Sequence, residues 1–322
     1  MKPVLQVRAL KKFFPVYGGF LSHVVGQVRA VDEVSFDIFE GETLGLVGES
    51  GCGKTTVGRM TIRLIEATSG QALFEGQDLF QLSPQELSAV RPRMQIIFQD
   101  PYSSLNPRFT VERIVGEAML IHNRANRMNL KEKVGEVLEK VGLSSRYMKR
   151  YPHEFSGGQR QRIGIARALA LDPRYLACDE PVSALDVSIQ AQIINLLQAL
   201  QEETRISMLF ISHDLNVVRH LSHRTAVMYL GKIVEMAPTP VLNREAAHPY
   251  TWALLAAKPE LDPKKKTVHV PLKGDVPSPL NPPSGCHFHP RCPEAMEQCK
   301  TRPPRMVELS KGHFVSCHLY GD

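Results

Sequence analysis

The sequence predicts an α/β fold built on a parallel sheet with helices on both faces. Strand-like apolar segments alternate with segments of helical periodicity, and a glycine-rich turn follows the first fully apolar strand. The 322 residues are 43% hydrophobic and 22% charged, which excludes collagen-like, coiled-coil and wholly disordered chains. This length favours two domains, one large and one small.

The individual elements follow in order along the chain. Alternating residues over 28–39 predict a strand, and the apolar run 43–48 predicts a second, buried strand before a helix over 54–66. A helix over 157–170 precedes a strand over 175–178, and apolar residues at helical spacing over 189–200 precede a strand over 207–211. Strand–helix–strand order of this kind is typical of parallel sheets.

Two regions depart from this alternation. Polar, helix-biased sequence between about 100 and 165 predicts a helical subdomain inserted into a main domain over 1–240. After residue 240 the composition changes, since eleven of the 23 prolines lie between Pro259 and Pro304. Proline disfavours helix interiors and central strands, so 241–322 is expected to be a small extension that needs another means of holding its shape.

Charge and hydropathy limit the partners and the compartment. The 39 Lys and Arg against 33 Asp and Glu give a net charge of +6, but the basic residues are scattered and often adjoin acids. The densest run, 264–266, is interpreted as a solvated linker, so no nucleic-acid partner is expected. The N-terminus lacks an apolar signal region and no apolar stretch reaches 18 residues, so a cytoplasmic protein, or one attached to a membrane through a partner, is expected.

The segment 48–55 satisfies the pattern G-x-x-x-x-G-K-[ST] between the predicted buried strand and a helix. Glycines allow the backbone to wrap around phosphates, Lys54 would reach the β- and γ-phosphates, and the Thr55 hydroxyl would bind Mg²⁺. The residues expected to contact the nucleotide are Gly48, Ser50, Gly51, Cys52, Gly53, Lys54, Thr55 and Thr56.

Two adjacent carboxylates close the strand predicted over 175–178. Asp179 is expected to hold Mg²⁺, and Glu180 to orient or deprotonate the water that attacks the γ-phosphate. No N-K-x-D motif for reading guanine is present, so ATP is favoured over GTP.

The segment 155–161, Phe-Ser-Gly-Gly-Gln-Arg-Gln, resembles the signature motif of ABC-type ATPases. The resemblance implies that Ser156, Gly157, Gly158 and Gln159 complete the ATP site of a second subunit, so that two chains enclose two nucleotides. It also identifies Gln99 as the Q-loop residue that contacts Mg²⁺ and nucleotide, 183–186 as the D-loop ending in Asp186, and His213 as the switch histidine. Phe155 departs from the leucine that commonly begins the signature.

The adenine ring is expected to stack on an aromatic side chain from the N-terminal strand. Phe14 is the first choice and Tyr17 the second.

Further segments resemble the ABC subfamily that imports oligopeptides and dipeptides, namely 228–231, 248–255 and 277–286. The resemblance implies an ATP-binding and hydrolysing subunit that energises peptide import from the cytoplasmic face of the inner membrane. It implies a second ATPase subunit, usually a paralogue, two membrane permeases and, indirectly, an extracytoplasmic peptide-binding protein. Importers of nickel, antimicrobial peptides or cell-wall peptides stay open as alternatives, and so does an ABC ATPase acting on nucleic acid.

Four of the six cysteines lie in the proline-rich extension, at Cys286, Cys292, Cys299 and Cys317. A segment that cannot build much core needs a cross-link or a metal, and a cytoplasmic compartment disfavours disulfides. The residues alone leave Zn²⁺, with help from nearby histidines, an iron–sulfur cluster and four unligated thiols open. The resemblance to the peptide importers implies a [4Fe–4S] cluster held by the four cysteines.

Overall fold

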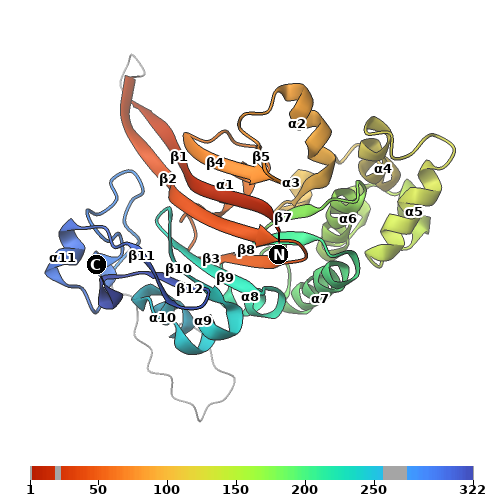
Figure 1. Ribbon diagram of the computed structural model, residues 1–322. Coiled ribbons are helices and arrows are strands. Elements are labelled where there is room, and N and C mark those ends of the chain that lie inside the picture. The colour runs from red at the N-terminus through yellow and green to blue at the C-terminus, as the bar shows by residue number, and fades with distance from the viewer. Residues whose placement is uncertain (1, 19–22, 257–273, 322) are drawn as a thin grey trace, which may run out of the picture.

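The computed structural model describes residues 2–18, 23–256 and 274–321, and a mixed sheet of eight strands lies at its centre (Figure 1). The strand order is β11-β12-β10-β9-β3-β8-β7-β6. The five strands from β9 to β6 are parallel, whereas β10, β12 and β11 continue the sheet in antiparallel fashion. The strands are β3 (Thr43–Val47), β6 (Met94–Ile97), β7 (Tyr175–Asp179), β8 (Ser207–Ser212), β9 (Arg224–Tyr229), β10 (Lys232–Pro238), β11 (Met306–Ser310) and β12 (His313–Ser316).

A second, antiparallel sheet of four strands covers part of the central one and was not predicted from the sequence. Its order is β2-β1-β4-β5, with β1 (Pro3–Gly18), β2 (His23–Phe39), β4 (Ser69–Phe74) and β5 (Gln77–Asp78). The ends of β1 and β2 form a hairpin that projects from the body of the molecule (Figure 1). Only the second half of this hairpin, 28–39, carries the alternating pattern that the sequence offered.

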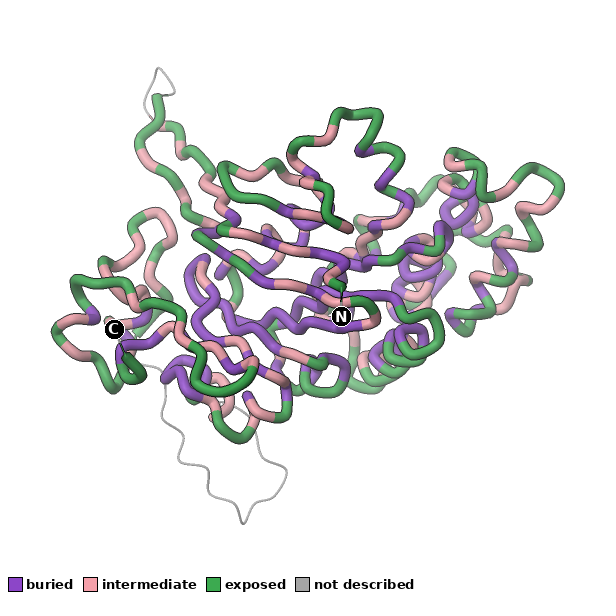
Figure 2. The backbone as a smooth tube through the Cα atoms, viewed as in Figure 1, coloured by how far each residue is buried: buried purple, intermediate pink, exposed green. Residues whose placement is uncertain are grey.

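Different elements pack on the two faces of the central sheet. On β7, Tyr175 and Ala177 pack with the antiparallel sheet and α1 (Lys54–Met60), whereas Leu176 and Cys178 pack toward the helices α6 (Gly157–Leu169), α7 (Val187–Thr204) and α8 (Leu215–Leu221). The prediction of helices on both faces is therefore only partly right, because a sheet shares one face with a helix. The central strands are buried along most of their length (Figure 2).

The segment around 100–165 contains the expected helices: α3 (Pro101–Ser104), α4 (Val111–Ile121), α5 (Leu130–Lys140), η2 (Ser145–Lys149) and η3 (Pro152–Glu154). Of these, α4 and α5 lie at one end of the molecule, and α3 lies nearer its middle (Figure 1). The helix expected over 54–66 instead ends at Met60. Its end has a physical cause, since Arg63 takes a left-handed φ of 50° and donates to the carbonyls of Leu79 and Leu82. The remaining helices before the extension are α2 (Pro84–Val90), η1 (Arg91–Arg93) and α9 (Thr239–Glu245).

The region after residue 240 is attached to the main sheet. It contains α10 (Pro249–Ala256), η4 (His289–Arg291), α11 (Glu297–Thr301) and η5 (His318–Tyr320), and its hairpin adds two strands to the sheet, β12 beside β10 and β11 at the edge. Glu235 on β10 is fully buried and accepts hydrogen bonds from the backbone N–H groups of Ala247 (2.7 Å) and His248 (3.0 Å) and from Nε2 of His313 (2.8 Å). One buried carboxylate thus joins three parts of the chain. No helix in the described ranges combines the length and apolar character needed to cross a bilayer.

Candidate functional site

The candidate site lies at one edge of the central sheet. The loops that follow β3, β6, β7 and β8 carry the glycine-rich segment, Gln99, the pair Asp179 and Glu180, and His213. Because these four strands are parallel, their carboxyl ends meet at the same edge, where α/β proteins bind ligands. The topology thus brings together residues that are up to 165 positions apart in the sequence, from Gly48 to His213.

The glycine-rich loop runs close to other backbone segments. A Cβ atom at Gly48 would lie 2.1 Å from the carbonyl oxygen of Met228, and one at Gly53 would lie 2.0 Å from that of Ala30. Gly53 also has a φ of 107°, which side chains strongly disfavour. Glycine at these two positions is therefore required by space as well as by conformation.

Lys54 is 4% exposed, and its ammonium group is held inside the loop. Nζ donates to the carbonyl oxygens of Gly48 (2.8 Å) and Glu49 (3.0 Å) and lies 3.9 Å from Oε1 of Glu180. Cys52 is buried beside it, and this burial raises the pKa of its thiol. The loop therefore holds one buried positive charge beside Glu180.

Glu180 is the meeting point of the predicted catalytic residues. Its Oε2 accepts a hydrogen bond from Nε2 of Gln99 (2.9 Å) and lies 3.4 Å from Nδ1 of His213. Its φ of 46° lies in the left-handed region, a backbone strain that proteins concentrate at functional sites. The carboxylate opens on a cavity of about 450 Å³, which is lined by Ser50, Gln99, Asp100, Glu180, Ser183, Ala184 and His213.

Asp179 and Thr55 lie deeper in the same site. The Thr55 hydroxyl donates to Oδ1 of Asp179 (2.8 Å), while the buried Oδ2 has no hydrogen-bond partner among the described residues and lies 3.8 Å from Nε of Arg59. Burial raises the pKa of Asp179, and the Thr55 bond and the Arg59 charge oppose this shift. A carboxylate oxygen without a donor beside a hydroxyl fits a hard cation such as Mg²⁺.

The sequence prediction did not include Arg59. A signal for it exists, because Arg59 follows Thr55 by one helical turn on α1 and therefore lies on the same helix face.

The signature segment opens α6 as expected. Ser156 caps the helix, its hydroxyl accepting from the backbone N–H of Gln159 (3.4 Å) while its own N–H donates to Oε1 of Gln159 (3.1 Å). A Cβ atom at Gly158 would lie 2.5 Å from Cγ2 of Ile189, whereas Gly157 has more room. No described hydrogen bond joins this segment to the glycine-rich loop of the same chain.

Two neighbours of the signature have simple environments. Phe155 is 5% exposed and makes an edge-to-face contact with Tyr147 at 5.6 Å, so it is a core residue of the helical subdomain, as a leucine would be. Asp186 is exposed at the N-cap of α7, and its side chain makes no capping hydrogen bond.

The two candidate adenine-stacking rings lie on β1. Phe14 is 37% exposed with Nζ of Lys12 5.0 Å from its ring centre, and Tyr17 is 62% exposed. Phe14 pairs with Val28 on β2, two residues from Ala30, whose carbonyl lies against Gly53. The hairpin therefore passes beside the glycine-rich loop with Phe14 closer along it than Tyr17.

The four cysteines of the extension do not form a metal site in the structure. All are free thiols, and no group of three or more His, Cys, Asp or Glu side chains within 2–18, 23–256 and 274–321 is placed to hold a metal ion. Cys286 and Cys292 lie against the main core and Cys317 lies in a smaller cluster with Ala247 and Val315, and the four thiols are within electrostatic reach of one another. Burial is the first cause that raises the pKa of Cys286 and of Cys292 to about 11. The expected cluster is not confirmed.

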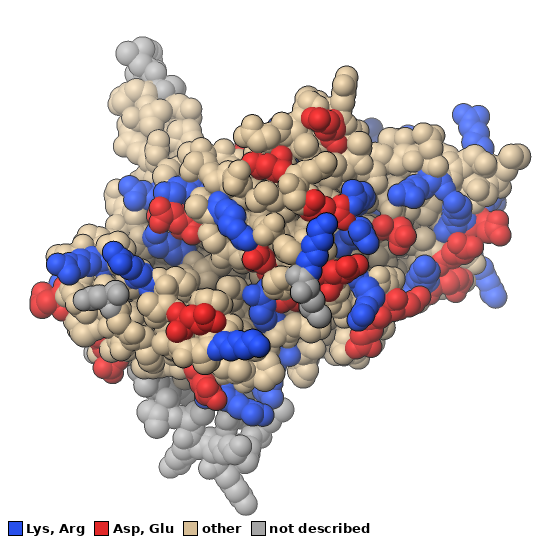
Figure 3. All heavy atoms as spheres, viewed as in Figure 1, with Lys and Arg blue, Asp and Glu red and all other residues tan. Residues whose placement is uncertain are grey.

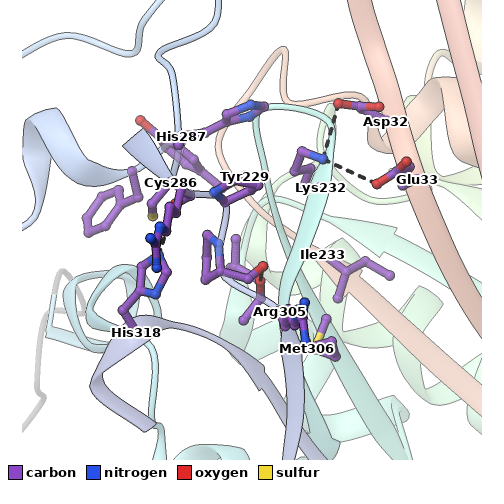
Figure 4. Close-up of a pocket in the computed structure, with 17 residues that line it drawn as sticks. Asp32, Glu33, Tyr229, Lys232, Ile233, Cys286, His287, Arg305, Met306 and His318 are labelled. Atoms are coloured by element: carbon purple, nitrogen blue, oxygen red, sulfur yellow. Dashed lines mark hydrogen bonds and ion pairs between the residues drawn. The ribbon is translucent and has the colours of Figure 1, made fainter. Parts of the chain in front are cut away.

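A larger cavity, of about 700 Å³, lies between β10 and the segments 285–288 and 302–306 of the extension (Figure 4). Lys232 points into it and is paired with Asp32 at 3.1 Å and Glu33 at 4.0 Å. Cys286 and His287 lie on the opposite wall. The lining of this cavity shares no residue with that of the cavity beside Glu180.

Charges of both signs are interspersed over the face shown in Figure 3. A continuous basic stripe, which typifies nucleic-acid binding, is not present on that face.

Comparison with known proteins agrees with this geometry. A family model described as "ABC transporter" matches residues 31–183, and one described as "Oligopeptide/dipeptide transporter, C-terminal region" matches 234–299. The oligopeptide transport ATP-binding protein AppF of Bacillus subtilis is 54% identical over 98% of this chain and 97% of its own length. A probable peptide ABC transporter ATP-binding protein, y4tS, of Sinorhizobium fredii is also 54% identical, over 98% of this chain and 90% of its own.

Solved structures match the core. A dimeric ATP-binding cassette, MJ0796, in a post-hydrolysis state bound to ADP and Pi superposes with a TM-score of 0.65 and 26% identity over 73% of this chain and 98% of that one. The α/β fold with an inserted helical subdomain is thereby confirmed, as is the resemblance drawn from the motifs. The chain belongs to the family of ABC transporter ATP-binding proteins, in the group that carries the oligopeptide/dipeptide transporter C-terminal region.

Proposed function

We propose that this chain binds and hydrolyses ATP to energise the import of dipeptides or oligopeptides through a membrane transporter complex. The observation that carries the proposal is the full-length similarity to peptide-transport ATP-binding proteins, which includes the extension as well as the ATPase core. The convergence of Lys54, Gln99 and His213 on Glu180 supports the hydrolytic part.

Each site residue has a chemical role in this proposal. Lys54 exchanges the carbonyls of the loop for the β- and γ-phosphate oxygens, and backbone N–H groups of the loop hold the remaining phosphate oxygens. Glu180 accepts a proton from water as the water oxygen attacks the γ-phosphorus and the bond to ADP breaks. Gln99 and His213 orient the Glu180 carboxylate and the transferred phosphate. Mg²⁺, held by Thr55, Asp179 and Gln99, would neutralise phosphate charge when bound.

We propose that the site is completed by a second ATPase subunit, whose Ser156, Gly157, Gly158 and Gln159 counterparts face the γ-phosphate. The exposure of Ser156 at the start of a 13-residue helix supports this, since a helix N-terminus attracts anions. Asp186, exposed at the next helix start, would contact the same interface. Mixing a Lys54→Ala subunit with a Ser156→Arg subunit should leave one intact composite site of two, and unchanged ATP occupancy in every pairing would contradict the arrangement.

The remaining partners follow from the importer assignment. Two permeases would hold the chain at the cytoplasmic face of the inner membrane, the paralogous ATPase would lie beside it, and a peptide-binding protein would act on the other side. No nucleic-acid partner is proposed. The names of the relatives support the transporter context.

For the extension we propose metal ligation by Cys286, Cys292, Cys299 and Cys317, with [4Fe–4S] as the first choice and Zn²⁺ as the alternative. The donor set supports it, since the sulfurs accept backbone N–H groups: Cys286 from Phe288, Cys292 from Glu294, Cys317 from Leu319 and Cys299 from Met296 (3.4 Å). The sulfurs have to turn toward one another for this. Anaerobically purified protein should contain about four irons per chain and absorb near 400 nm, whereas colourless, metal-free protein would leave four unligated thiols.

Uptake measurements with different labelled substrates test which class of substrate the complex imports. Cells expressing the assembled complex should take up labelled dipeptides and longer peptides, and a Glu180→Gln subunit should abolish uptake while the complex still assembles. Uptake of nickel with no uptake of peptide would replace the substrate but keep the ATPase. Failure to assemble with any permease would contradict the importer assignment.

A further inference from the structure

Glu49 in the glycine-rich loop forms hydrogen bonds with two residues of the extension. Its carboxylate accepts a bidentate pair from Arg291, with Nη1 2.7 Å from Oε2 and Nη2 3.1 Å from Oε1. Its backbone N–H donates to the hydroxyl of Tyr250 at 2.9 Å. Arg291 is 242 residues away in the sequence and Tyr250 is 201 residues away, so residue 49 is the direct link between the loop and the region after 240.

The surroundings leave Arg291 few alternative partners. Its side chain is 6% exposed, and its Nη1 also lies 3.5 Å from the hydroxyl of Tyr229. The rings of Tyr229, Tyr250 and Phe288 pack on one another at centroid distances of 4.7–5.4 Å. A guanidinium in such a setting is well placed for bidentate recognition and would be costly to leave unpaired.

Residue 49 also touches the phosphate-binding lysine. Its carbonyl oxygen accepts from Nζ of Lys54 at 3.0 Å, and it is followed by Ser50 and by Gly51 and Gly53, which both have positive φ. A glycine-rich loop has many unbound conformations, and ordering it on binding lowers affinity. A contact that fixes Glu49 before ATP arrives removes part of that cost.

We propose that Arg291 and Tyr250 are positioning residues of the ATP site, and that the extension holds the glycine-rich loop in its phosphate-binding shape through Glu49. In this proposal the extension contributes to ATP binding, because it fixes the conformation of the glycine-rich loop. This inference rests on the assignment of the loop over 48–56 as the ATP site.

The experiment measures ATP affinity and turnover of the purified full-length chain. Arg291→Ala should raise the Kd and KM for ATP about tenfold, within the roughly 5- to 150-fold range of couplings between distinct sites, while kcat at saturating ATP changes less than about twofold. Arg291→Lys keeps the charge and should recover part of the affinity. Tyr250→Phe removes only the hydroxyl and should give a smaller rise in Kd. Arg305→Ala is the matched control, because Arg305 is an exposed arginine of the same region.

A double-mutant cycle shows whether Arg291 acts through Glu49. In a Glu49→Gln background, Arg291→Ala should have little further effect on the Kd. Fully additive effects would overturn the proposal, and so would an Arg291→Ala variant with a lower Tm and unchanged ATP affinity, which would make Arg291 an anchor of the extension alone. Lys54→Ala separates the two levels: if it leaves ATP binding intact, the ATP-site assignment itself fails.

Discussion

The side chains of the strand-end site and those of the extension are held in place by different interactions. At the strand ends, the backbone of four parallel strands fixes where Lys54, Glu180 and His213 lie, and the side chains make few bonds: His213 is 55% exposed and meets Glu180 at 3.4 Å. The extension is less regular and is attached to the main sheet by buried polar side chains, as Glu235 of β10 holds His313 of the extension. We therefore expect changes at the strand ends to affect turnover with little effect on folding, and changes at the contact between Glu235 and His313 to affect stability first.

The largest effect should follow from Glu180→Gln. An amide cannot accept the proton of the attacking water, so turnover should fall by roughly 10² to 10⁴, the usual loss for a general base, while ATP still binds. Phosphate release and ATP binding measured on the same preparation test this. Its thermal midpoint should stay close to that of the unchanged chain, because Glu180 makes only two close side-chain contacts with the described residues besides Lys54.

Glu203→Gln is the control, since Glu203 is exposed near the end of α7. Turnover above about a tenth of the original value in Glu180→Gln would remove the general-base role. Lys54→Ala, in contrast, should weaken ATP binding as well as hydrolysis, because it deletes the charge that meets the phosphates.

Glu235→Gln should lower stability and leave turnover nearly unchanged, the opposite of Glu180→Gln. The amide keeps the shape of the side chain but loses the charge and one acceptor, so at least one of the three donors that Glu235 satisfies is left without a full partner. A buried donor in that condition costs about 1–3 kcal/mol. Denaturant unfolding should show this loss, and protease should cut the extension faster.

The matched control is Glu294→Gln, an exposed carboxylate of the extension. If Glu235→Gln lowered kcat as strongly as it lowered stability, the contrast between the two regions would be wrong, and the extension would be as directly catalytic as the strand ends.

The same contrast explains what the sequence could reveal. The site motifs are local: the glycine pattern over 48–55, the carboxylates after 175–178 and the serine that opens α6 each lie beside the element that positions them. Their position at one site was therefore predictable from spacing, and the structure brings Lys54, Glu180, Gln99 and His213 together. The sheet β2-β1-β4-β5 was missed because β1 and β4 carry weak alternation and their pairing is long-range.

The extension was predictable only in composition. Proline content correctly indicated little central strand, but no local signal links Arg291 to Glu49 or His313 to Glu235, since these pairs span 242 and 78 residues. The sequence shows that four cysteines lie in the extension, but their spacing does not predict how their sulfur atoms are arranged in space. In the structure Cys286 and Cys292 pack against the main core and Cys317 packs in a separate small cluster, which a count of residues between cysteines cannot reveal.

A moderate effect should appear as a pH dependence of the extension. Burial lowers the pKa of His248 from its usual 6.5 to about 3, and its Nδ1 accepts from the backbone N–H of Tyr250 at 3.0 Å, which requires the neutral ring. The unfolded chain binds this proton below pH 6.5 and the folded chain does not, so stability falls as the pH falls from about 6.5 toward 3. The slope from this one group is about 1.4 kcal/mol per pH unit.

His248→Asn is the variant that isolates the contribution of His248, because asparagine offers a side-chain acceptor at a similar position and does not titrate. Unfolding free energies of both chains between about pH 4 and 5.5, where the unfolded histidine is protonated and the folded one is neutral, should differ in slope by that amount. Parallel curves would show that His248 takes up its proton in the folded state without cost, and the burial argument would fail.

The smallest effect tests the border between the two regions, the hairpin β1–β2 that passes beside the glycine-rich loop. If adenine stacks on Phe14, Phe14→Ala should raise the Kd for ATP by about two- to tenfold, which corresponds to roughly 0.5–1.5 kcal/mol for an aromatic contact. Stability should hardly change, since Phe14 is 37% exposed. Tyr17→Ala is both control and rival, because Tyr17 lies on the same strand at 62% exposure. An effect confined to Tyr17→Ala would move the stacking role three residues along β1, and unchanged Kd values for ATP in both variants would indicate that neither ring stacks on the base. Pairing of Phe14 with Val28, two residues from the Ala30 carbonyl that abuts Gly53, favours Phe14, because an adenine whose phosphates lie in the loop meets the nearer ring first.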